Sequence, residues 1–462
     1  MREPFKHQLE GIEFLKKNKR AILADQPGLG KTLQAITAAG TTSSGAILVI
    51  CPASLKINWE REIHMVYPED NVIIISGGAA TDHISKAAWI IINYDILSKH
   101  LPMLKEMVKN GEIETIIGDE AHYCKDTKTL RTKAFLSLTE HAQQVYCLTG
   151  TPVMNRPIEI FALLKAVKHP LAHSQDKTAS ALRKEFGKRY CAAYFHQFGR
   201  SGRGFWDETG SSRLPELRAL TKDIFLRRTK TEVLDLPEKI VSVVPTTLST
   251  EYQRAYDTAW DNYLEWVANH PEGKDLKNIM SAQALVELGK LKQVCSLAKI
   301  SRIVTDVENF IEQGEKVIIF SQYTETIKTL AQQLRKEGSV TLTGADDMDM
   351  RQAAMDAFQN DENCKVFIAN MKAGGVGITL TAGSIVIFAD MEWSPEIHRQ
   401  AEDRAHRIGQ TGTVNVYYYI AESTIEEDII DTLMNKQETI GVLTGGETVI
   451  QAFMDRLIQK TK

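Results

Sequence analysis

Three short segments of the chain carry side chains that can bind a phosphate group and promote its hydrolysis. The first, residues 26–32, contains Gly28, Gly30, Lys31 and Thr32 between an apolar run and a stretch of helix formers. A strand followed by such a loop and a helix directs backbone N–H groups towards a phosphate. The lysine would pair with the β- and γ-phosphates, and the threonine hydroxyl would hold Mg²⁺. Taken alone, the segment could also be a glycine-rich turn before an ordinary helix.

The second segment is an acidic pair, Asp119 and Glu120, which closes the apolar run 115–118. One carboxylate of such a pair can hold Mg²⁺ while the next activates the attacking water. An isolated pair of this kind would more often be a solvated acidic loop. Its position after an apolar strand and downstream of a phosphate loop favours the catalytic interpretation.

The third segment contains two arginines, Arg404 and Arg407, which share one face if the segment is helical. Two guanidinium groups can stabilise the negative charge that spreads over a transferred phosphoryl group. The alternative is a charged surface helix, because Glu402 and Asp403 are adjacent partners. The arginines lie far along the chain from the loop, so we expect a second domain to bring them to the nucleotide.

Weaker signals stand beside these three segments. Thr149 and Thr151 follow an apolar run and offer two hydroxyls near the end of the Asp119 strand. The glycines at 374–377 could let a backbone approach a phosphate closely, or could form a tight turn. The basic cluster 227–230 could contact a phosphate backbone, although most such clusters are solvated faces.

The elements that must position these groups alternate between apolar strands and helical stretches, which predicts an α/β fold. Continuous apolar runs rich in β-branched residues are typical of parallel sheets covered on both faces. Residues 156–299 are instead rich in helix formers, with a Gly/Ser/Arg-rich loop at 198–212. The expected strands are 21–25, 46–51, 72–76, 89–93, 115–119, 144–149, and then 316–321, 340–343, 365–370, 385–390 and 414–421.

The bulk composition restricts the class of protein. The 462 residues are enough for two or three domains, and the net charge of −4 requires any nucleic-acid contact to come from local positive patches. Six scattered cysteines form no Cys-x-x-Cys pair, and no apolar run is long enough to span a membrane. We therefore expect a soluble protein with no membrane partner, which is cytoplasmic in a bacterial or phage-infected cell, or nuclear in a eukaryote.

Together the motifs resemble those of the Swi/Snf-type superfamily 2 DNA translocases, which are helicase-like ATPases. Residues 25–32 resemble that family's phosphate loop, which explains Asp25 where the general pattern has glycine. Residues 5–11 resemble its adenine-recognising opening motif. The further matches are 51–55 with Trp59, 119–122, 148–152, 373–381 and 400–410, and the brace helix is expected at 422–436.

Two segments distinguish this type from other superfamily 2 branches, namely 404–410, and 226–230 followed by 236–239. Residues 189–193 and 400–404 look most like the annealing-helicase subgroup of fork-remodelling translocases. Departures from the pattern, at Gln26-Pro27, Thr379 and Ser394, remove no catalytic group. We expect no accessory DNA-recognition, zinc-finger or nuclease module, and a compact motor of this kind would suit a phage or bacterial genome.

The resemblance implies two tandem RecA-like lobes, parallel sheets with flanking helices, with helical insertions and with ATP and Mg²⁺ bound in the cleft between the lobes. The implied domains are 1–170, the ATP-binding lobe; 171–300, the insertions and linker; and 301–462, the second lobe. Glu120, Asp119, Lys31, Arg404 and Arg407 are the implied catalytic residues, and Asp119 and Thr32 the Mg²⁺ ligands. Nucleotide contacts are implied for Gln8, Gly28, Gly30, Lys31, Thr32 and Gln400, coupling for Thr149 and Thr151, and DNA contacts for Pro52, Lys56, Gly374, Gly375 and Trp393.

The leading hypothesis is an ATP-dependent translocase on double-stranded or branched DNA, monomeric because one chain carries both lobes, with a protein partner unidentified. A strand-separating helicase on branched DNA or RNA is the first alternative. It needs a wedge element, for which a hairpin in the 198–212 loop could serve. The second alternative is an ATP-gated module that binds DNA or displaces a protein from it with little translocation.

Overall fold

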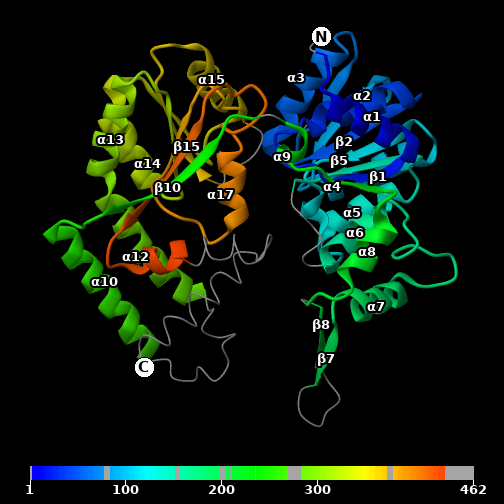
Figure 1. The fold of residues 1–462 in the computed structure, drawn as a ribbon. Coiled ribbons are helices and arrows are strands. Elements are labelled where there is room, and N and C mark those ends of the chain that lie inside the picture. Colours follow the sequence, from blue (N-terminus) through cyan, green and yellow to red (C-terminus); the bar gives the residue numbers. More distant parts are fainter. Residues whose placement is uncertain are drawn as a thin grey trace. The chain divides into compact units, whose positions relative to one another are not determined.

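A computed structural model describes residues 3–77, 84–150, 157–197, 204–208, 210–234, 236–268, 282–371 and 378–431. The chain forms two compact units, Met1–Asp235 and Leu236–Lys462, which we call unit 1 and unit 2 (Figure 1). None of the described helices is long and apolar enough to cross a membrane.

Unit 1 is built on a seven-stranded sheet with the order β3-β4-β2-β5-β6-β1-β9. All its strand pairs are parallel. Strands β2, β4 and β5 are almost entirely buried, as continuous apolar sequence predicts for a covered parallel sheet. The strands are β1 Arg20–Leu23, β2 Ala46–Cys51, β3 Val72–Ile74, β4 Trp89–Asn93, β5 Ile113–Gly118, β6 Gln144–Leu148 and β9 Phe225–Leu226.

Helices cover both faces of this sheet. Figure 1 shows α1, α2 and α3 above the sheet and α4, α5 and α6 below it, and within each group neighbouring helices pack side by side. The helices are α1 Lys6–Asn18, α2 Lys31–Thr42, α3 Lys56–Val66, α4 Leu97–Lys109, α5 Leu130–Thr139, α6 Pro157–Ala166, α7 Ala179–Tyr190, α8 Leu214–Thr221 and α9 Lys230–Val233. Short 3₁₀ helices lie at η1 Ala53–Leu55, η2 Ile84–Lys86 and η3 Ala121–Cys124.

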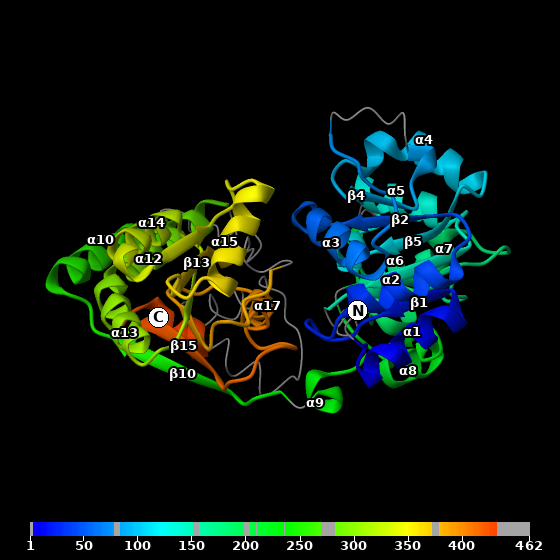
Figure 2. The same ribbon diagram turned by 90° about the horizontal axis from the view of Figure 1, so that it is seen from above.

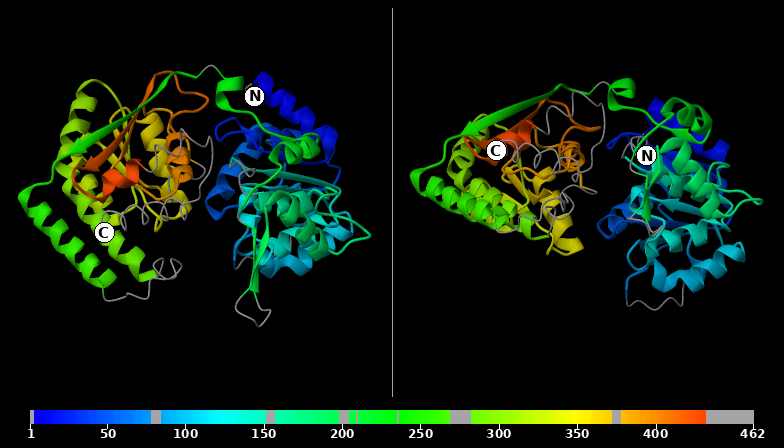
Figure 3. Two further views of the ribbon diagram at one scale, coloured as in Figure 1. Left: turned by 60° about the horizontal axis from the view of Figure 1, so that its bottom comes forward. Right: turned by 90° about the horizontal axis from the view of Figure 1, so that it is seen from below.

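Unit 1 also carries a separate antiparallel hairpin, β7 Tyr194–Gln197 and β8 Gly204–Asp207. Strand β8 falls in the segment 198–212 that the sequence predicts as a loop. Figures 1 and 3 show the hairpin projecting from unit 1 beyond α7 and α8. Residues 198–203 lie outside the described residues.

Unit 2 is built on a six-stranded parallel sheet with the order β10-β15-β14-β11-β13-β12. Helices α13 and α14 cover one face of the sheet, and α15 and α17 the other (Figure 2). The strands are β10 Lys239–Thr246, β11 Val317–Ser321, β12 Ser339–Leu342, β13 Val366–Asn370, β14 Ile385–Phe388 and β15 Val414–Ala421. The helices are α10 Thr250–Ala268, α12 Ala282–Ala298, α13 Ile300–Glu312, α14 Thr324–Gln333, α15 Met348–Asn360 and α17 Pro395–Glu402, with 3₁₀ helix η5 Arg335–Glu337.

The predicted fold class, two α/β units with parallel sheets and flanking helices, is confirmed. Each expected strand is present, with both ends within two residues of the expected ones. Strand β10 was not predicted. It is an edge strand that pairs only with β15, and none of its residues before Thr246 is buried. The expected helical segment 171–300 belongs partly to each unit, and the three-domain division stays a prediction.

Candidate functional site in unit 1

Three neighbouring strands of unit 1 bring the predicted phosphate loop, the acidic pair and Thr149 to one edge of the sheet. Strands β5, β6 and β1 are adjacent and parallel, so their carboxyl ends meet there. The ends of β1 and β6 are in close contact, since a Cβ built on Gly150 would lie 2.7 Å from Pro27 and 3.6 Å from the Lys31 Nζ. Ligand sites of open α/β sheets lie at such edges.

The loop between β1 and α2 requires its two glycines. Gly28 has φ of 89° and Gly30 has φ of 75°, which are left-handed conformations that other residues rarely adopt. A Cβ on Gly30 would also lie 2.2 Å from the Gln8 amide nitrogen. Gly30 caps the N-terminus of α2, so the loop leads into a helix end that attracts anions.

Lys31 and Thr32 begin α2 at this loop. The Lys31 Nζ donates to the carbonyl oxygens of Asp25 at 2.7 Å and Gln26 at 3.4 Å, and the side chain is 9% exposed. The ammonium is thereby held against the backbone of the loop. Thr32 is half-buried on the first turn of α2, and its role as an Mg²⁺ ligand stays a prediction.

Asp25, which replaces the glycine of the general pattern, forms a buried ion pair with Arg228. The Arg228 Nη2 lies 2.6 Å from Oδ2 of Asp25, and its Nε lies 3.1 Å from Oδ1. Arg228 also donates to the Gln34 side chain and to the His7 carbonyl. The sequence left open whether the cluster 227–230 contacts a phosphate backbone or forms a solvated face. In the structure Arg228 is buried against Asp25 and is not part of a solvated face. A buried carboxylate in the loop requires a buried cation, which is the signal that could have found it.

Asp119 lies directly after β5 and is 7% exposed. Its Oδ2 accepts a hydrogen bond of 2.8 Å from the Trp59 indole N–H, and its Oδ1 accepts one of 2.9 Å from the Glu120 backbone N–H. Burial first, and then the negative charge of Glu120, raise the pKa of Asp119 to about 7, while Lys31 opposes the shift. Two adjacent carboxylates, of which Asp119 has this raised pKa, fit a site for a divalent cation, which would neutralise them.

Glu120 adopts the left-handed backbone conformation, with φ of 47°, which is costly for a residue with a side chain and is found most often at functional sites. Its Oε2 lies 3.2 Å from the His122 Nδ1, and the same nitrogen lies 3.5 Å from the Thr149 Oγ1. His122 therefore links the predicted base to the predicted coupling residue. The second coupling residue, Thr151, lies outside the described residues.

The opening motif packs against the phosphate loop. The Gln8 Nε2 donates to the Leu29 carbonyl at 3.3 Å, and the His7 Nε2 lies 3.1 Å from the same oxygen. Both side chains are buried, with exposed fractions of 3–4%. The predicted adenine-contacting residue thus lies at the loop, with its amide hydrogen-bonded to the loop backbone.

The predicted DNA contacts of unit 1 lie at the start of α3. Pro52 caps the 3₁₀ turn η1 and is buried. Lys56 is 5% exposed, its Nζ donates to the Ile75 carbonyl at 3.3 Å, and burial lowers the pKa of its ammonium. Trp59, on the same helix, is fully buried. Helix α3 therefore connects the segment predicted to contact DNA to the Asp119 carboxylate.

In unit 2, Arg404 and Arg407 follow α17 in a turn, because the helix ends at Glu402. They converge all the same, since both guanidinium groups donate to the Ile378 carbonyl, at 3.4 Å and 3.3 Å. The alternative of a charged surface helix required Glu402 to be exposed beside these arginines, and it is not. It is 3% exposed and lies 2.6 Å from the Lys239 Nζ.

The other predicted residues of unit 2 have the following surroundings. Gln400 is half-buried, and its amide donates to Glu396 at 3.4 Å. Trp393 is half-buried, with the Lys292 ammonium 4.6 Å from its ring centre. Gly374 and Gly375 lie outside the described residues.

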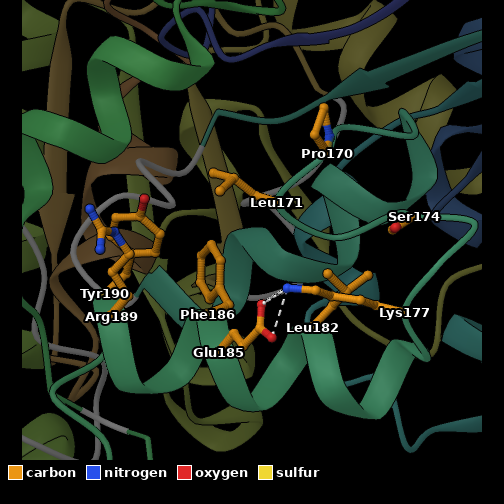
Figure 4. A pocket seen from close by; sticks show the side chains of 9 residues that line it. All are labelled: Pro170, Leu171, Ser174, Lys177, Leu182, Glu185, Phe186, Arg189 and Tyr190. Atoms are coloured by element: carbon orange, nitrogen blue, oxygen red, sulfur yellow. Dashed lines mark hydrogen bonds and ion pairs between the residues drawn. The ribbon is translucent and has the colours of Figure 1, made fainter.

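A cavity of about 240 Å³ lies away from the phosphate loop, between α7 and the segment before it (Figure 4). Leu182 and Phe186 form its apolar wall. Lys177 and Glu185 pair across its rim at 2.8 Å, as Figure 4 shows. Nothing in its lining contributes to the site at the sheet edge.

Comparison with known proteins agrees with these observations. A family model for an SNF2-related domain matches residues 7–300, and a model for a helicase conserved C-terminal domain matches residues 297–409. The "DNA annealing helicase and endonuclease ZRANB3" of Homo sapiens is 30% identical over 96% of this chain and 41% of its own length. A Caenorhabditis elegans homolog of "SWI/SNF-related matrix-associated actin-dependent regulator of chromatin subfamily A-like protein 1" is 32% identical over 95% of this chain and 61% of its own.

Among solved structures, the Sulfolobus solfataricus SWI2/SNF2 ATPase core in complex with dsDNA aligns over 94% of this chain and 93% of that chain. It has 26% identity and a TM-score of 0.44. The chain spans about two fifths of the human relative and three fifths of the nematode relative. The family match extends over both units, and the chain belongs to the SNF2-related family of helicase-like proteins.

Proposed function

We propose that the protein is an ATP-dependent translocase on double-stranded DNA, which couples ATP hydrolysis to movement on DNA or to its remodelling. The observation that carries the proposal is the sheet edge of unit 1. At this edge three adjacent strands are followed by the loop that carries Lys31, by the acidic pair Asp119 and Glu120, and by Thr149. The names of the relatives, a DNA annealing helicase and a SWI/SNF-related regulator of chromatin, support DNA as the polymer.

ATP is the proposed substrate, bound by the loop 25–32. Gln8 would contact adenine, and the N–H groups of the loop with Lys31 would hold the phosphates. Asp119 and Thr32 fit the ligation of Mg²⁺, which when bound supplies a positive charge to the phosphate oxygens. Gln400 of unit 2 is a further proposed nucleotide contact.

Glu120 is the proposed general base. It would accept the proton of a water whose oxygen attacks the γ-phosphorus, while the bond from that phosphorus to the bridging β-phosphate oxygen breaks. His122 orients this carboxylate and connects it to Thr149. Arg404 and Arg407 are proposed to stabilise the charge on the transferred phosphoryl group.

DNA contacts are proposed for the segment around Pro52 and Lys56 and for Trp393, Gly374 and Gly375. Contacts of a translocase are expected mainly with phosphates rather than bases. Lys56 is buried in the described structure, so its part would be to fix the position of the segment that contacts DNA. One chain carries both units, so we propose a monomer.

The first test measures ATP hydrolysis with no nucleic acid, blunt duplex DNA, single-stranded DNA, forked DNA and RNA. We expect duplex DNA to stimulate hydrolysis. Loss of a general base lowers kcat by about 10²–10⁴-fold, so Glu120→Gln is expected to abolish the stimulated rate while ATP still binds. Lys177→Ala, which removes a lysine at the cavity rim of the same unit, is the control.

The outcomes separate the alternatives. Stimulation by single strands or RNA alone would favour a strand-separating helicase. ATP hydrolysis that no polymer changes would contradict the proposed function.

A further inference from the structure

Hairpin β7–β8 exposes a pair of aromatic rings on one of its faces. Phe195 and Trp206 are directly opposite in the register of the two strands, so their side chains lie on the same face. Their ring centres are 5.6 Å apart, and the two residues are 43% and 40% exposed. A two-stranded hairpin has no core of its own, so these rings are available for contact with another molecule.

Two lysines of α7 lie beside the Trp206 ring. The Nζ atoms of Lys184 and Lys188 are each 5.6 Å from the ring centre. The lysines are one helical turn apart and exposed, and neither forms an ion pair among the described residues. The surface therefore joins flat apolar rings to two positive charges.

The other basic side chains of α7 are already paired. Arg183 lies 2.5 Å from Glu208, and Arg189 lies 2.7 Å from Glu216. Arg189 also lines the cavity on the opposite side of the helix (Figure 4). Helix α7 thus packs one side into unit 1 and presents Lys184 and Lys188 on the side of the hairpin.

We propose that Phe195, Trp206, Lys184 and Lys188, here called the hairpin surface, bind unpaired nucleotides of DNA. Bases would stack on the rings and phosphates would contact the ammonium groups, which is the usual way in which single strands are held. A blunt duplex offers no free base faces along its length. The hairpin surface would therefore make the protein prefer forked or tailed DNA. The proposal rests on the proposed function for DNA as the polymer and adds the structure of that DNA.

The test measures the Kd for a fork with single-stranded arms and for a blunt duplex of equal length, by fluorescence anisotropy without nucleotide. Stacking of one base affects affinity strongly, so Trp206→Ala is expected to raise the Kd for the fork about tenfold and that for the duplex less than about twofold. Trp206→Phe keeps a ring in place and is expected to retain most of the affinity for the fork. The pair Lys184→Ala and Lys188→Ala is expected to weaken the same contact and to make it less sensitive to salt.

Two matched controls are available. Lys177→Ala removes an ammonium that pairs with Glu185 at the cavity rim of the same unit. Met350→Ala removes an apolar side chain that is 62% exposed in unit 2. Both are expected to bind fork and duplex as the unchanged protein does.

An unchanged Kd for the fork in both Trp206→Ala and the lysine pair would overturn the proposal. Equal weakening on fork and duplex would also overturn it, because the contact would then be general. If Trp206→Ala fails to fold, the lysine pair, whose side chains are exposed, decides the question. ATP hydrolysis by the unchanged protein that ignores every DNA would instead contradict the proposed function itself.

Discussion

The burial of the Asp119 carboxylate next to Glu120 reduces the stability of the folded protein when no ligand is bound. Asp119 is buried next to Glu120, and this raises its pKa to about 7. The folded chain then holds a proton on Asp119 between about pH 4 and pH 7, where the unfolded chain has released it. The stabilisation from this proton is present below about pH 4 and is lost as the pH rises through about 7.

Asp119→Asn is therefore expected to stabilise the protein at pH 8 in the presence of a metal chelator, by roughly 1–3 kcal/mol, while it abolishes ATP hydrolysis. Urea denaturation of both proteins at pH 5 and pH 8 measures the effect. The advantage of Asp119→Asn should shrink at pH 5, because the aspartate is then protonated. A variant that is less stable than the unchanged protein at pH 8 would show that the hydrogen bond from Trp59 outweighs the burial of the charge.

The sequence predicts which side chains form the candidate site, but it does not predict which other residues these side chains contact. Lys31, Asp119 and Glu120 stand in motifs that chemistry restricts to few residue types. Arg228 lies far along the chain from Asp25, and only the folded sheet, through the pairing of β9 with β1, brings them together. A local sequence pattern cannot predict a contact between two residues that lie so far apart in the chain.

At the scale of elements, α3 is the connection between the predicted DNA contacts and the hydrolytic site. The Trp59 indole donates to Asp119 from the same helix that begins at Lys56. A small shift of α3 on binding DNA would move this hydrogen bond.

Trp59→Phe keeps the ring in the core and removes only the N–H donor. A hydrogen bond to a charged group contributes about 1.5–3 kcal/mol, so the DNA-stimulated kcat is expected to fall about ten- to a hundredfold. The KM for ATP should change little, because Trp59 contacts Asp119 and none of the residues proposed to bind adenine. Steady-state kinetics with and without duplex DNA measure both constants. Equal kcat values in the two proteins would show that this contact serves packing alone.

The strands could be predicted because parallel, buried strands have continuous apolar sequence, as in β2 and β4. Strand β10 was missed because it is an edge strand with no buried residue before Thr246. The strands of the hairpin were not predicted, because β7 and β8 have no apolar run, and the sequence suggested a hairpin in the 198–212 loop only as a wedge for the helicase alternative. The condition that Arg404 and Arg407 share one helix face is not met, because α17 ends at Glu402. Gln410 donates to the Thr381, Gly383 and Ala405 carbonyls and turns the chain after α17.

At the scale of the whole molecule, unit 1 and unit 2 each have a hydrophobic core and a parallel sheet of their own. The loop, the acidic pair and the opening motif belong to unit 1, whereas Arg404 and Arg407 belong to unit 2. If all of these residues act in one reaction, as we propose, each cycle of hydrolysis requires both units. That requirement is the physical basis of movement along a polymer.

The measurement that tests movement most directly is the displacement of a third DNA strand placed far from the site where the protein first binds the duplex. We expect the unchanged protein to release the third strand with ATP, and we expect no release by Glu120→Gln or with a nonhydrolysable ATP analogue. Arg407→Ala should bind ATP and DNA but fail to release the strand. ATP hydrolysis stimulated by the duplex without any release of the third strand would contradict translocation and favour the ATP-gated displacement module.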